Sequence, residues 1–331
     1  MKTRNELLDT VLDSFSMAII EADTNKSAKH EGRVTSRYWP TECSAVTPVG
    51  VVGRCRRRTY YSQQGVVVPQ EEDIRSLGRF KVGNILEEWI RELASHSGIR
   101  HDNSVKIRYF IPGSDDKIQI SGEVDMIYKV DDEIVGGEIK TSYGYDFEST
   151  VFHKATIPGM PKVEHVMQVL SYLYYYKYID KSLKITRFVI TYLNRGSMEW
   201  IQHMIELSDD LYPIINGIKL QGIFSGTNKI FTLPGINFEK TRIKLSAYEF
   251  SMNSVFERFI EIYNHHESGL LISNDYNPLY SDTQVTDYAL SGKIGKTKFA
   301  DYRNGKIDYL ADRECEWCPY RINCLKDLGI L

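Results

Sequence analysis

The sequence contains no long uninterrupted run of apolar residues, and a membrane-spanning helix needs about 18 of them. The apolar stretch at residues 10–20 is broken by an acidic side chain, Asp13, and no small-residue cleavage site follows it. A secretory signal is therefore not expected either. We expect a soluble, cytoplasmic protein that has no membrane partner.

The sequence also lacks an excess of charge of either sign. Lysine and arginine number 41 against 44 aspartates and glutamates, for a formal net charge of −3. This balance excludes a histone-like or polybasic protein, so any nucleic-acid site must be a local patch. Because 42% of its 331 residues are hydrophobic, the chain is not intrinsically disordered and can bury one large core or two modest ones.

Cysteine is scarce, with five residues in the chain, which excludes a framework of disulfides and fits a reducing compartment. Three of the five lie close together near the C-terminal end, at Cys315, Cys318 and Cys324. Thiolates spaced this closely suit a soft metal better than disulfide pairing. The spacing alone fits tetrahedral zinc and an iron–sulfur cluster equally well, and either Cys43 or Cys55 could supply a fourth ligand.

The spacing of apolar residues predicts a mixed α/β chain, in the order helix, three strands, helix and two strands. Residues 23–33 are expected to form a polar loop. A further helix is expected within residues 208–312, to which we assign no chemistry, and its apolar seam is expected to be ordinary core packing: Phe250, Val255, Phe259 and Ile262. We expect helices at 80–96, 162–179 and 247–265, and strands at 105–111, 117–130, 133–141, 184–194 and 199–207.

Candidate chemistry begins on the second and third strands. Residues two apart on a strand project from one face, so Glu138 and Lys140 should point the same way, and Asp125 can join them from the neighbouring strand. Two carboxylates and a main-chain carbonyl suit a hard cation such as Mg²⁺, and Lys140 could position or deprotonate a bound water. An ordinary ion pair on a solvated strand face fits the pattern equally well. Gly136 and Gly137 indicate the close approach of another backbone or a ligand, because glycine weakens a strand.

The helix that follows adds a second pair of polar residues. Gln168 and Tyr172 are four residues apart and therefore share one helix face. An amide and a phenol there could hold a water and a phosphate. The alternative is a surface glutamine beside a packed tyrosine.

Taken in order, these pieces resemble the RecB-like branch of the PD-(D/E)xK nucleases. The pattern of that family is Gly-x-x-x-His on a helix, Gly-x-x-Asp and Glu-x-Lys on two strands, and Gln-x-x-x-Tyr on a helix. Residues 122–125, 138–140 and 168–172 match the last three motifs, and residues 83–87 match the first with Glu87 in place of the histidine. A carboxylate at this position is a competent magnesium ligand.

This resemblance implies a restriction-endonuclease-like core, in which helices flank a mixed central sheet, and DNA cleavage that depends on Mg²⁺ or Mn²⁺. Lys140 would orient the attacking water and offset the charge that builds on the phosphate, while Gln168 and Tyr172 secure the site. The implied metal ligands are Glu87, Asp125, Glu138 and the main-chain carbonyl of Ile139.

The cysteines resemble those of the iron–sulfur members of this family, the CRISPR-associated exonucleases and the AddB-type helicase–nucleases. In these proteins one cysteine before the nuclease core and three after it hold a four-iron four-sulfur cluster, which joins the N- and C-terminal segments. Residues 54–61 are similar to the family's Cys-Pro-Arg-Arg-x-Tyr-Tyr opening, with arginine in place of the proline. The resemblance therefore favours iron–sulfur over zinc, and Cys55 over Cys43. The implied ligands are Cys55, Cys315, Cys318 and Cys324.

The strongest basic run of the chain lies beside the first of these cysteines. Its arginines could contact phosphates, and Tyr60 and Tyr61 could offer a stacking surface for single-stranded DNA. The alternative is a solvated charge run. The expected DNA-binding residues are Arg54, Arg56, Arg57 and Arg58.

The sequence thus favours a metal-dependent DNA nuclease, an exonuclease on single-stranded ends, that acts in repair, recombination, or CRISPR-type or phage DNA processing. The alternative is a catalytically degenerate DNA-binding or assembly subunit that keeps the fold. No motif identifies a protein partner. We expect four consecutive segments: an N-terminal segment at 1–62, the nuclease core at 63–207, an extension at 208–312 and the cysteine motif at 313–331.

Overall fold

A computed structural model describes residues 36–66, 74–144, 147, 159–223, 225 and 243–331. The expected polar loop at 23–33 and the apolar stretch at 10–20 lie outside these ranges. Within the ranges, no helix is both long and apolar enough to cross a membrane. The chain divides into two compact units, Met1–Val52 with Glu71–Glu257, and Gly53–Gln70 with Arg258–Leu331. The two units interleave along the sequence, whereas the four expected segments are consecutive.

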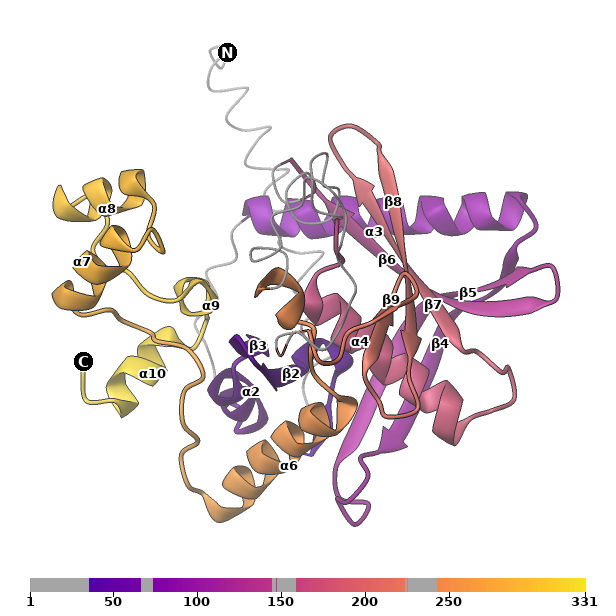
Figure 1. The fold of residues 1–331 in the computed structure, drawn as a ribbon, viewed down its shortest axis with the longest axis horizontal. Coiled ribbons are helices and arrows are strands. Elements are labelled where there is room, and N and C mark those ends of the chain that lie inside the picture. Colours follow the sequence, from indigo (N-terminus) through magenta and orange to yellow (C-terminus); the bar gives the residue numbers. More distant parts are fainter. Residues whose placement is uncertain (1–35, 67–73, 145–146, 148–158, 224, 226–242) are drawn as a thin grey trace, which may run out of the picture. The chain divides into compact units, whose positions relative to one another are not determined.

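The first unit is built on a curled mixed sheet, to which the described residues contribute eight strands (Figure 1). The strand order is β1-β5-β6-β7-β8-β9-β10, and β4 pairs with β5 outside this path. β1 and β5 are parallel, as are β6 and β7, whereas the other pairs are antiparallel. The strands are β1 (Arg37–Tyr38), β4 (Arg100–Phe110), β5 (Gln119–Val130), β6 (Glu133–Ser142), β7 (Arg187–Asn194), β8 (Trp200–Leu207), β9 (Pro213–Ile215) and β10 (Ile218–Lys219).

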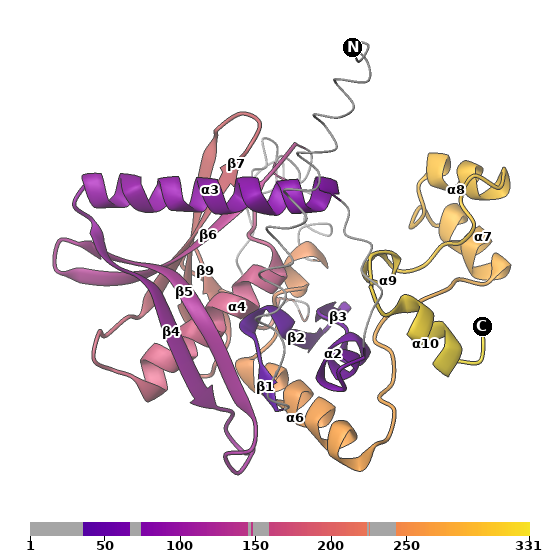
Figure 2. The ribbon, with the colours of Figure 1, turned by 180° about the vertical axis from the view of Figure 1, so that it is seen from behind.

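Two helices pack on this sheet, one on each face (Figures 1 and 2). On one face lies α3 (Ile74–His96), which buries Ile90 and Ala94 against apolar side chains of β5, β6 and β7. On the other lies α4 (Val163–Tyr174), which continues as a π-helical turn at Tyr175–Ile179. Its residues from Val166 to Leu173 are all buried. The predicted mixed sheet flanked by helices is thus confirmed.

The predicted elements agree with the structure in kind and in order. The first helix begins earlier than the predicted residue 80, at Ile74, because Gly78 and Arg79 interrupt the apolar spacing on which the prediction rests. The helix predicted at 247–265 is α6 (Met252–Ser268). All four side chains of its apolar seam are buried, so their assignment to core packing is confirmed.

Among its described residues, the second unit contains most of α6, from Arg258 onward, four short helices and an extended segment around residue 275. The buried carboxylate of Asp275 accepts from Arg56 Nε at 2.9 Å and from Arg258 Nη2 at 2.6 Å. The Tyr61 hydroxyl donates to Asp327 Oδ2 at 2.5 Å. These contacts join the early and late segments of the unit. The four short helices are α2 (Arg56–Gln63), α7 (Asp282–Leu290), α8 (Lys296–Arg303) and α10 (Arg321–Asp327), and a single turn forms α9 (Arg313–Glu316).

The two glycines of β6 adjoin aromatic rings. A side chain on Gly136 would overlap the ring of Phe188, and one on Gly137 would overlap the ring of Tyr128. The expectation that another backbone or a ligand approaches these glycines is therefore wrong. The rings of the neighbouring strands occupy the space instead.

The consequence can be tested with Gly136→Ala, which should lower the free energy of unfolding by about 1–3 kcal/mol, the usual range for an overpacked core. Gly78→Ala in α3 is the control, because a methyl group there meets no atom within 4 Å and alanine favours a helix. Urea unfolding followed by tryptophan fluorescence measures both. Equal losses in the two variants would contradict the packing explanation.

Candidate active site

The site is built where β5 and β6 separate. The two strands pair from Val130 and Glu133 as far as Met126 and Gly137 and then diverge. Beyond this point the main-chain N–H of Ile139 donates to Asp125 Oδ2 at 2.8 Å. The carboxylate of Asp125 thus satisfies the N–H of a residue that no longer pairs with β5.

Glu138 and Lys140 lie next to Asp125 on the face of the sheet that α4 covers. Glu138 is 1% exposed, and its Oε1 accepts from Lys140 Nζ and, at 2.7 Å, from Gln168 Nε2. Its Oε2 is buried and has no hydrogen-bond partner among the described residues. A solvated strand face does not describe these residues, because both the carboxylate and most of the lysine are withdrawn from water.

Gln168 and Tyr172 hold Glu138 from α4. Gln168 Nε2 also donates to the Tyr172 hydroxyl at 2.9 Å, and this hydroxyl donates to the carbonyl of Glu123 at 3.0 Å. Gly122 makes room for the pair, because a side chain there would lie 3.1 Å from the tyrosine ring. Gln168 is buried, so the surface-glutamine alternative is wrong. The pair serves to position the Glu138 carboxylate.

Glu87 approaches the site from α3. Its carboxylate forms an ion pair with Arg91 on the next turn of the helix, and Arg91 Nη1 also lies 3.2 Å from Glu88 Oε2. Burial, and then the carboxylate of Asp125, raises the pKa of Glu87. Glu87 therefore lies close enough to Asp125 for the two carboxylates to repel each other, although the charge of Glu87 is already paired with Arg91.

Burial dominates the electrostatics of the site. It raises the pKa of Glu138 from 4.5 to about 8, and it raises the pKa of Asp125 as well. Burial opposes the charge on Lys140, but the carboxylates of Glu138 and Asp125 outweigh it and raise the pKa of Lys140. The site therefore keeps an ammonium beside carboxyl groups that hold their protons unusually strongly.

The sequence analysis missed His165, which lies one turn before Gln168 on the same face of α4. The Tyr192 hydroxyl accepts from the main-chain N–H of Lys162 at 2.9 Å and lies within hydrogen-bond distance of His165 Nδ1, at 2.7 Å. Burial, and then Lys140, lowers the pKa of His165 well below its ordinary value. Both causes favour the neutral imidazole. The spacing 165–168–172 on one helix face was the signal that could have found it.

The donor set of the site can be compared with the needs of a divalent cation. Within the ranges that the structure describes, no three His, Cys, Asp or Glu side chains are arranged to hold a metal ion as they stand. The buried Oε2 of Glu138 nevertheless lacks a donor, and leaving a buried carboxylate oxygen unpaired is costly. The nearby oxygens, of Asp125 and the Ile139 carbonyl, are of the kind that Mg²⁺ and Mn²⁺ prefer.

Four cysteines line one small cavity of the second unit: Cys55, Cys315, Cys318 and Cys324. Burial, and then the nearby thiols of the other three, raises the pKa of Cys315. Arg57 Nη1 lies 3.5 Å from Cys324 Sγ and can donate to it. Cys43 belongs to the first unit, where it is buried 3.5 Å from Ser171 Oγ, and burial raises its pKa to about 12. The four expected ligands thus line one cavity of the second unit, although as they stand these described thiols are not arranged to hold a metal ion, and Cys43 belongs to the other unit.

Two of the four arginines beside Cys55 are engaged in hydrogen bonds and ion pairs within the second unit. Arg57 is buried and donates to the carbonyl of Ile272 at 2.8 Å, while Arg56 is paired with Asp275 and Glu261. These two guanidinium groups support the fold, and a solvated charge run does not describe them. Arg54 and Arg58 are half-buried.

Tyr60 and Tyr61 follow this run on α2, and both are buried. The expectation that they offer a stacking surface to single-stranded DNA is therefore wrong. Their rings pack inside the second unit, where Tyr61 lies 5.5 Å from the ring of Tyr320.

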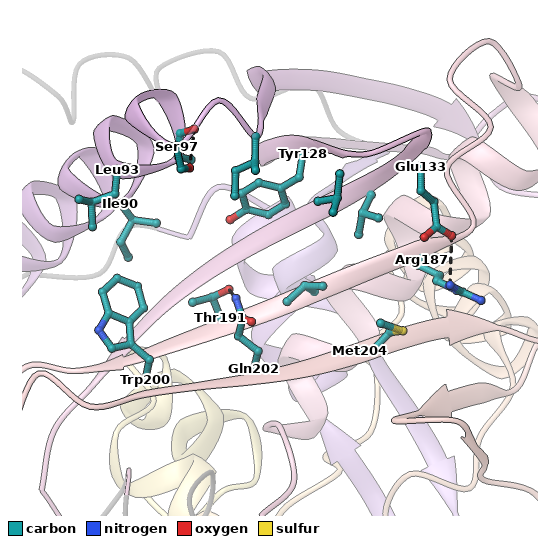
Figure 3. Close-up of a pocket in the computed structure, with 15 residues that line it drawn as sticks. Ile90, Leu93, Ser97, Tyr128, Glu133, Arg187, Thr191, Trp200, Gln202 and Met204 are labelled. Carbon is teal, nitrogen blue, oxygen red and sulfur yellow. Dashed lines mark hydrogen bonds and ion pairs between the residues drawn. The ribbon is translucent and has the colours of Figure 1, made fainter.

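A larger groove, of about 620 Å³, lies on the α3 face of the sheet and is lined mainly by apolar side chains (Figure 3). Trp200 and Met204 of β8 face it from one side and Leu93 of α3 from another. Its charged groups, Glu133 and Arg187, are paired with each other at 3.1 Å. The groove holds no group of carboxylates, so we do not assign the chemistry to it.

Comparisons with known proteins add little to this geometry. No protein-family model matches the chain, and no curated protein matches it. Among solved structures, the crystal structure of SSO0001 is similar over 57% of this chain and 76% of that one, with 16% sequence identity and a TM-score of 0.37. A likeness this distant carries no argument about fold or function.

The raised pKa of Glu138 predicts how the metal-free protein responds to pH. Since the folded state keeps this proton up to about pH 8 and the unfolded chain releases it near 4.5, the stability that Glu138 contributes is lost as pH rises between these values. Glu138→Gln removes this loss, so the difference in melting temperature between the variant and the wild type should shift in favour of the variant from pH 5 to pH 8. Glu123→Gln, at an exposed position of β5, is the control. The same difference from wild type at both pH values would refute the assignment.

Proposed function

We propose that this chain is a metal-dependent DNA nuclease with a restriction-endonuclease-like core. The observation that carries the proposal is the meeting of Asp125, Glu138 and Lys140 where two strands separate, with one carboxylate oxygen buried and unpaired. Burying carboxylates together costs several kcal/mol, and strongly perturbed carboxyl groups are typical of functional sites. A purely structural ion pair would not require a second carboxylate beside the first.

In this proposal Asp125, Glu138 and the Ile139 carbonyl hold Mg²⁺ or Mn²⁺, and Glu87 completes the set from α3. A bound cation of this kind polarises the scissile phosphate and lowers the pKa of the attacking water. Lys140 orients the water and offsets negative charge that develops on the phosphate. Gln168 and Tyr172 fix the Glu138 carboxylate, which leaves Oε2 available to the cation.

For the second unit we propose a four-iron four-sulfur cluster held by Cys55, Cys315, Cys318 and Cys324. Their common cavity and the adjacent guanidinium of Arg57 support the proposal, because a positive group favours thiolates. The cluster would join α2 to the C-terminal helices of the unit. Zinc on the same four thiolates is the alternative, and metal analysis separates the two.

The rival function is a degenerate subunit that binds DNA without cleaving it. One observation favours it: the carboxylate that replaces the family's histidine, Glu87, is already paired with Arg91. DNA cleavage by the pure protein with Mg²⁺ or Mn²⁺ separates the two functions. Substrates labelled at the 5′ or the 3′ end report the polarity in the same assay.

For catalysis we expect Asp125→Asn and Lys140→Ala each to lower the cleavage rate by about 10²-fold or more, the usual effect of losing a group that stabilises the transition state. Neither change should unfold the protein. Glu87→Ala should lose activity, while Glu87→His should retain it with Mn²⁺. Glu88→Ala is the control, since Glu88 also contacts Arg91 but is exposed. Wild-type rates in the Asp125 or Lys140 variant would sink the site assignment.

For the cluster we expect anaerobically purified protein to be brown and to contain iron and sulfide. Cys55→Ala should lose the colour and the iron, because three thiolates remain where four are needed. Cys43→Ala is the matched control and should stay coloured, since Cys43 lies in the first unit. Stoichiometric zinc without iron would reject the cluster, and colour lost only with Cys43 would reverse the ligand assignment.

A further inference from the structure

Two aromatic rings are exposed around the carboxyl end of β6. Tyr143 follows directly after the strand and is 65% exposed, and Phe80 on α3 is 70% exposed. Both belong to the first unit, and neither takes part in its core. Exposed aromatic rings that lie close to a candidate site are typical of a binding surface.

Contacts within the first unit bring this end of β6, the start of α3 and the turn between β7 and β8 together. A side chain on Gly83 of α3 would lie 3.5 Å from Thr141 Oγ1, so the helix passes over the end of β6. Arg195, in the turn, donates from Nη1 to the carbonyl of Arg79 at 3.3 Å. Phe80 and Tyr143 therefore lie on one rim of the unit.

The ring of Tyr143 adjoins the turn between β7 and β8. A side chain on Gly196 would lie 2.9 Å from the tyrosine Cε2, although the φ of Gly196 is one that any residue can adopt. Glycine at 196 therefore leaves room for the ring. The contact is with one edge of the ring, at Cε2 and Cδ2, and the residue is 65% exposed. An exposed aromatic ring can stack on the face of a base.

The rim is also basic. From Ile74 to Leu86, α3 contains three arginine or lysine residues and no acidic one, and Arg79 and Lys81 among them are exposed. Arg195 carries a buried Nε that has no hydrogen-bond partner among the described residues. In a chain with a net charge of −3, this is the local patch that a nucleic-acid site requires.

The rim lies at the carboxyl end of β6, the strand that carries Glu138 and Lys140 of the proposed active site. β6 and β7 are parallel, and ligands of such sheets bind beyond the carboxyl ends of the strands. Lys140 is three residues before Tyr143 on the same chain segment.

We infer that a single DNA strand lies along this rim, with bases stacked on Tyr143 and Phe80 and phosphates against Arg79, Lys81 and Arg195. The inference rests on the proposed function and specifies the substrate that its site takes. Duplex DNA does not fit equally well, because its base faces are covered by stacking inside the helix. In this inference Tyr143 and Phe80 take the stacking role that the sequence analysis assigned to Tyr60 and Tyr61 of α2, which are buried.

The test measures binding by fluorescence anisotropy with the full-length protein and a labelled thymidine oligonucleotide, without added divalent cation so that no strand is cleaved. Tyr143→Ala should weaken single-strand binding by about 5- to 100-fold, because loss of one stacked base costs about 1–3 kcal/mol. Binding of a hairpin duplex should change by less than about 2-fold. Tyr143→Trp should retain single-strand affinity. Trp317→Ala, at a side chain 80% exposed in the second unit, is the matched control and should change neither.

The phosphate contacts have their own test. Lys81→Ala should reduce the slope of log affinity against log salt concentration by about one, because one phosphate contact is lost. Lys296→Ala, at one of the exposed lysines of the second unit, is the control. Tyr143→Ala and Trp317→Ala with equal effects would overturn the inference, as would equal losses on duplex and single strand.

The outcomes also separate the inference from the proposed function. Protein that binds single strands through Tyr143 but never cleaves them would refute the nuclease and support the rim. If wild-type protein cleaves DNA but the Tyr143→Ala variant binds single strands as tightly as wild type, the nuclease is supported and the rim is refuted. Wild-type protein that binds no DNA would overturn both.

Discussion

The hydrogen bond from the main-chain N–H of Ile139 to Asp125 is the contact on which the candidate site depends. Where β5 and β6 part, a buried N–H would otherwise lack its acceptor, which costs about 1–3 kcal/mol. The carboxylate that fills this gap is then held beside the next residue on the strand, Glu138. The separation of β5 and β6 therefore brings the two carboxyl groups of the site together, and one of them, Asp125, accepts the hydrogen bond that the separation would otherwise leave unmade.

Glu138 shows how the fold supports a group that burial destabilises. Its carboxyl group is held on one oxygen by an ammonium and an amide, Lys140 and Gln168, and these bonds fix its orientation. The other oxygen has no donor among the described residues. Since burial raises the pKa of Glu138, the cation that we propose would have to compete with a proton for this carboxyl group.

Sequence periodicity was sufficient to predict the main helices and strands of the first unit, but not the short elements such as β1, β9 and α2. Alternation along β6 placed Glu138 and Lys140 on one face, and the observed contact between their side chains agrees. Periodicity could not show which other side chains surround a given residue. Gly136 looked like a place for a ligand but adjoins Phe188, and Arg57 looked exposed but donates to a carbonyl inside the second unit.

The remaining misses have the same physical origin. His165 was overlooked because a histidine on a helix has no significance until Tyr192 and Lys140, which are distant in sequence, are known to lie beside it. Tyr61 could not be recognised as buried because its partners lie far along the chain, such as Asp327, which is 266 residues away. Contacts of long sequence separation are invisible to local patterns.

The interleaving of the two units has a consequence for biosynthesis. Strands and helices of the first unit pair largely with near neighbours in sequence, and its last residue is Glu257. The second unit joins Arg56 to Asp275, 219 residues apart, so its early segment must wait on the ribosome until the late one has emerged. During that interval α2 lacks the contacts that Asp275 and Asp327 later supply. The second unit can therefore fold only after residues that follow the whole sheet in the chain have been made.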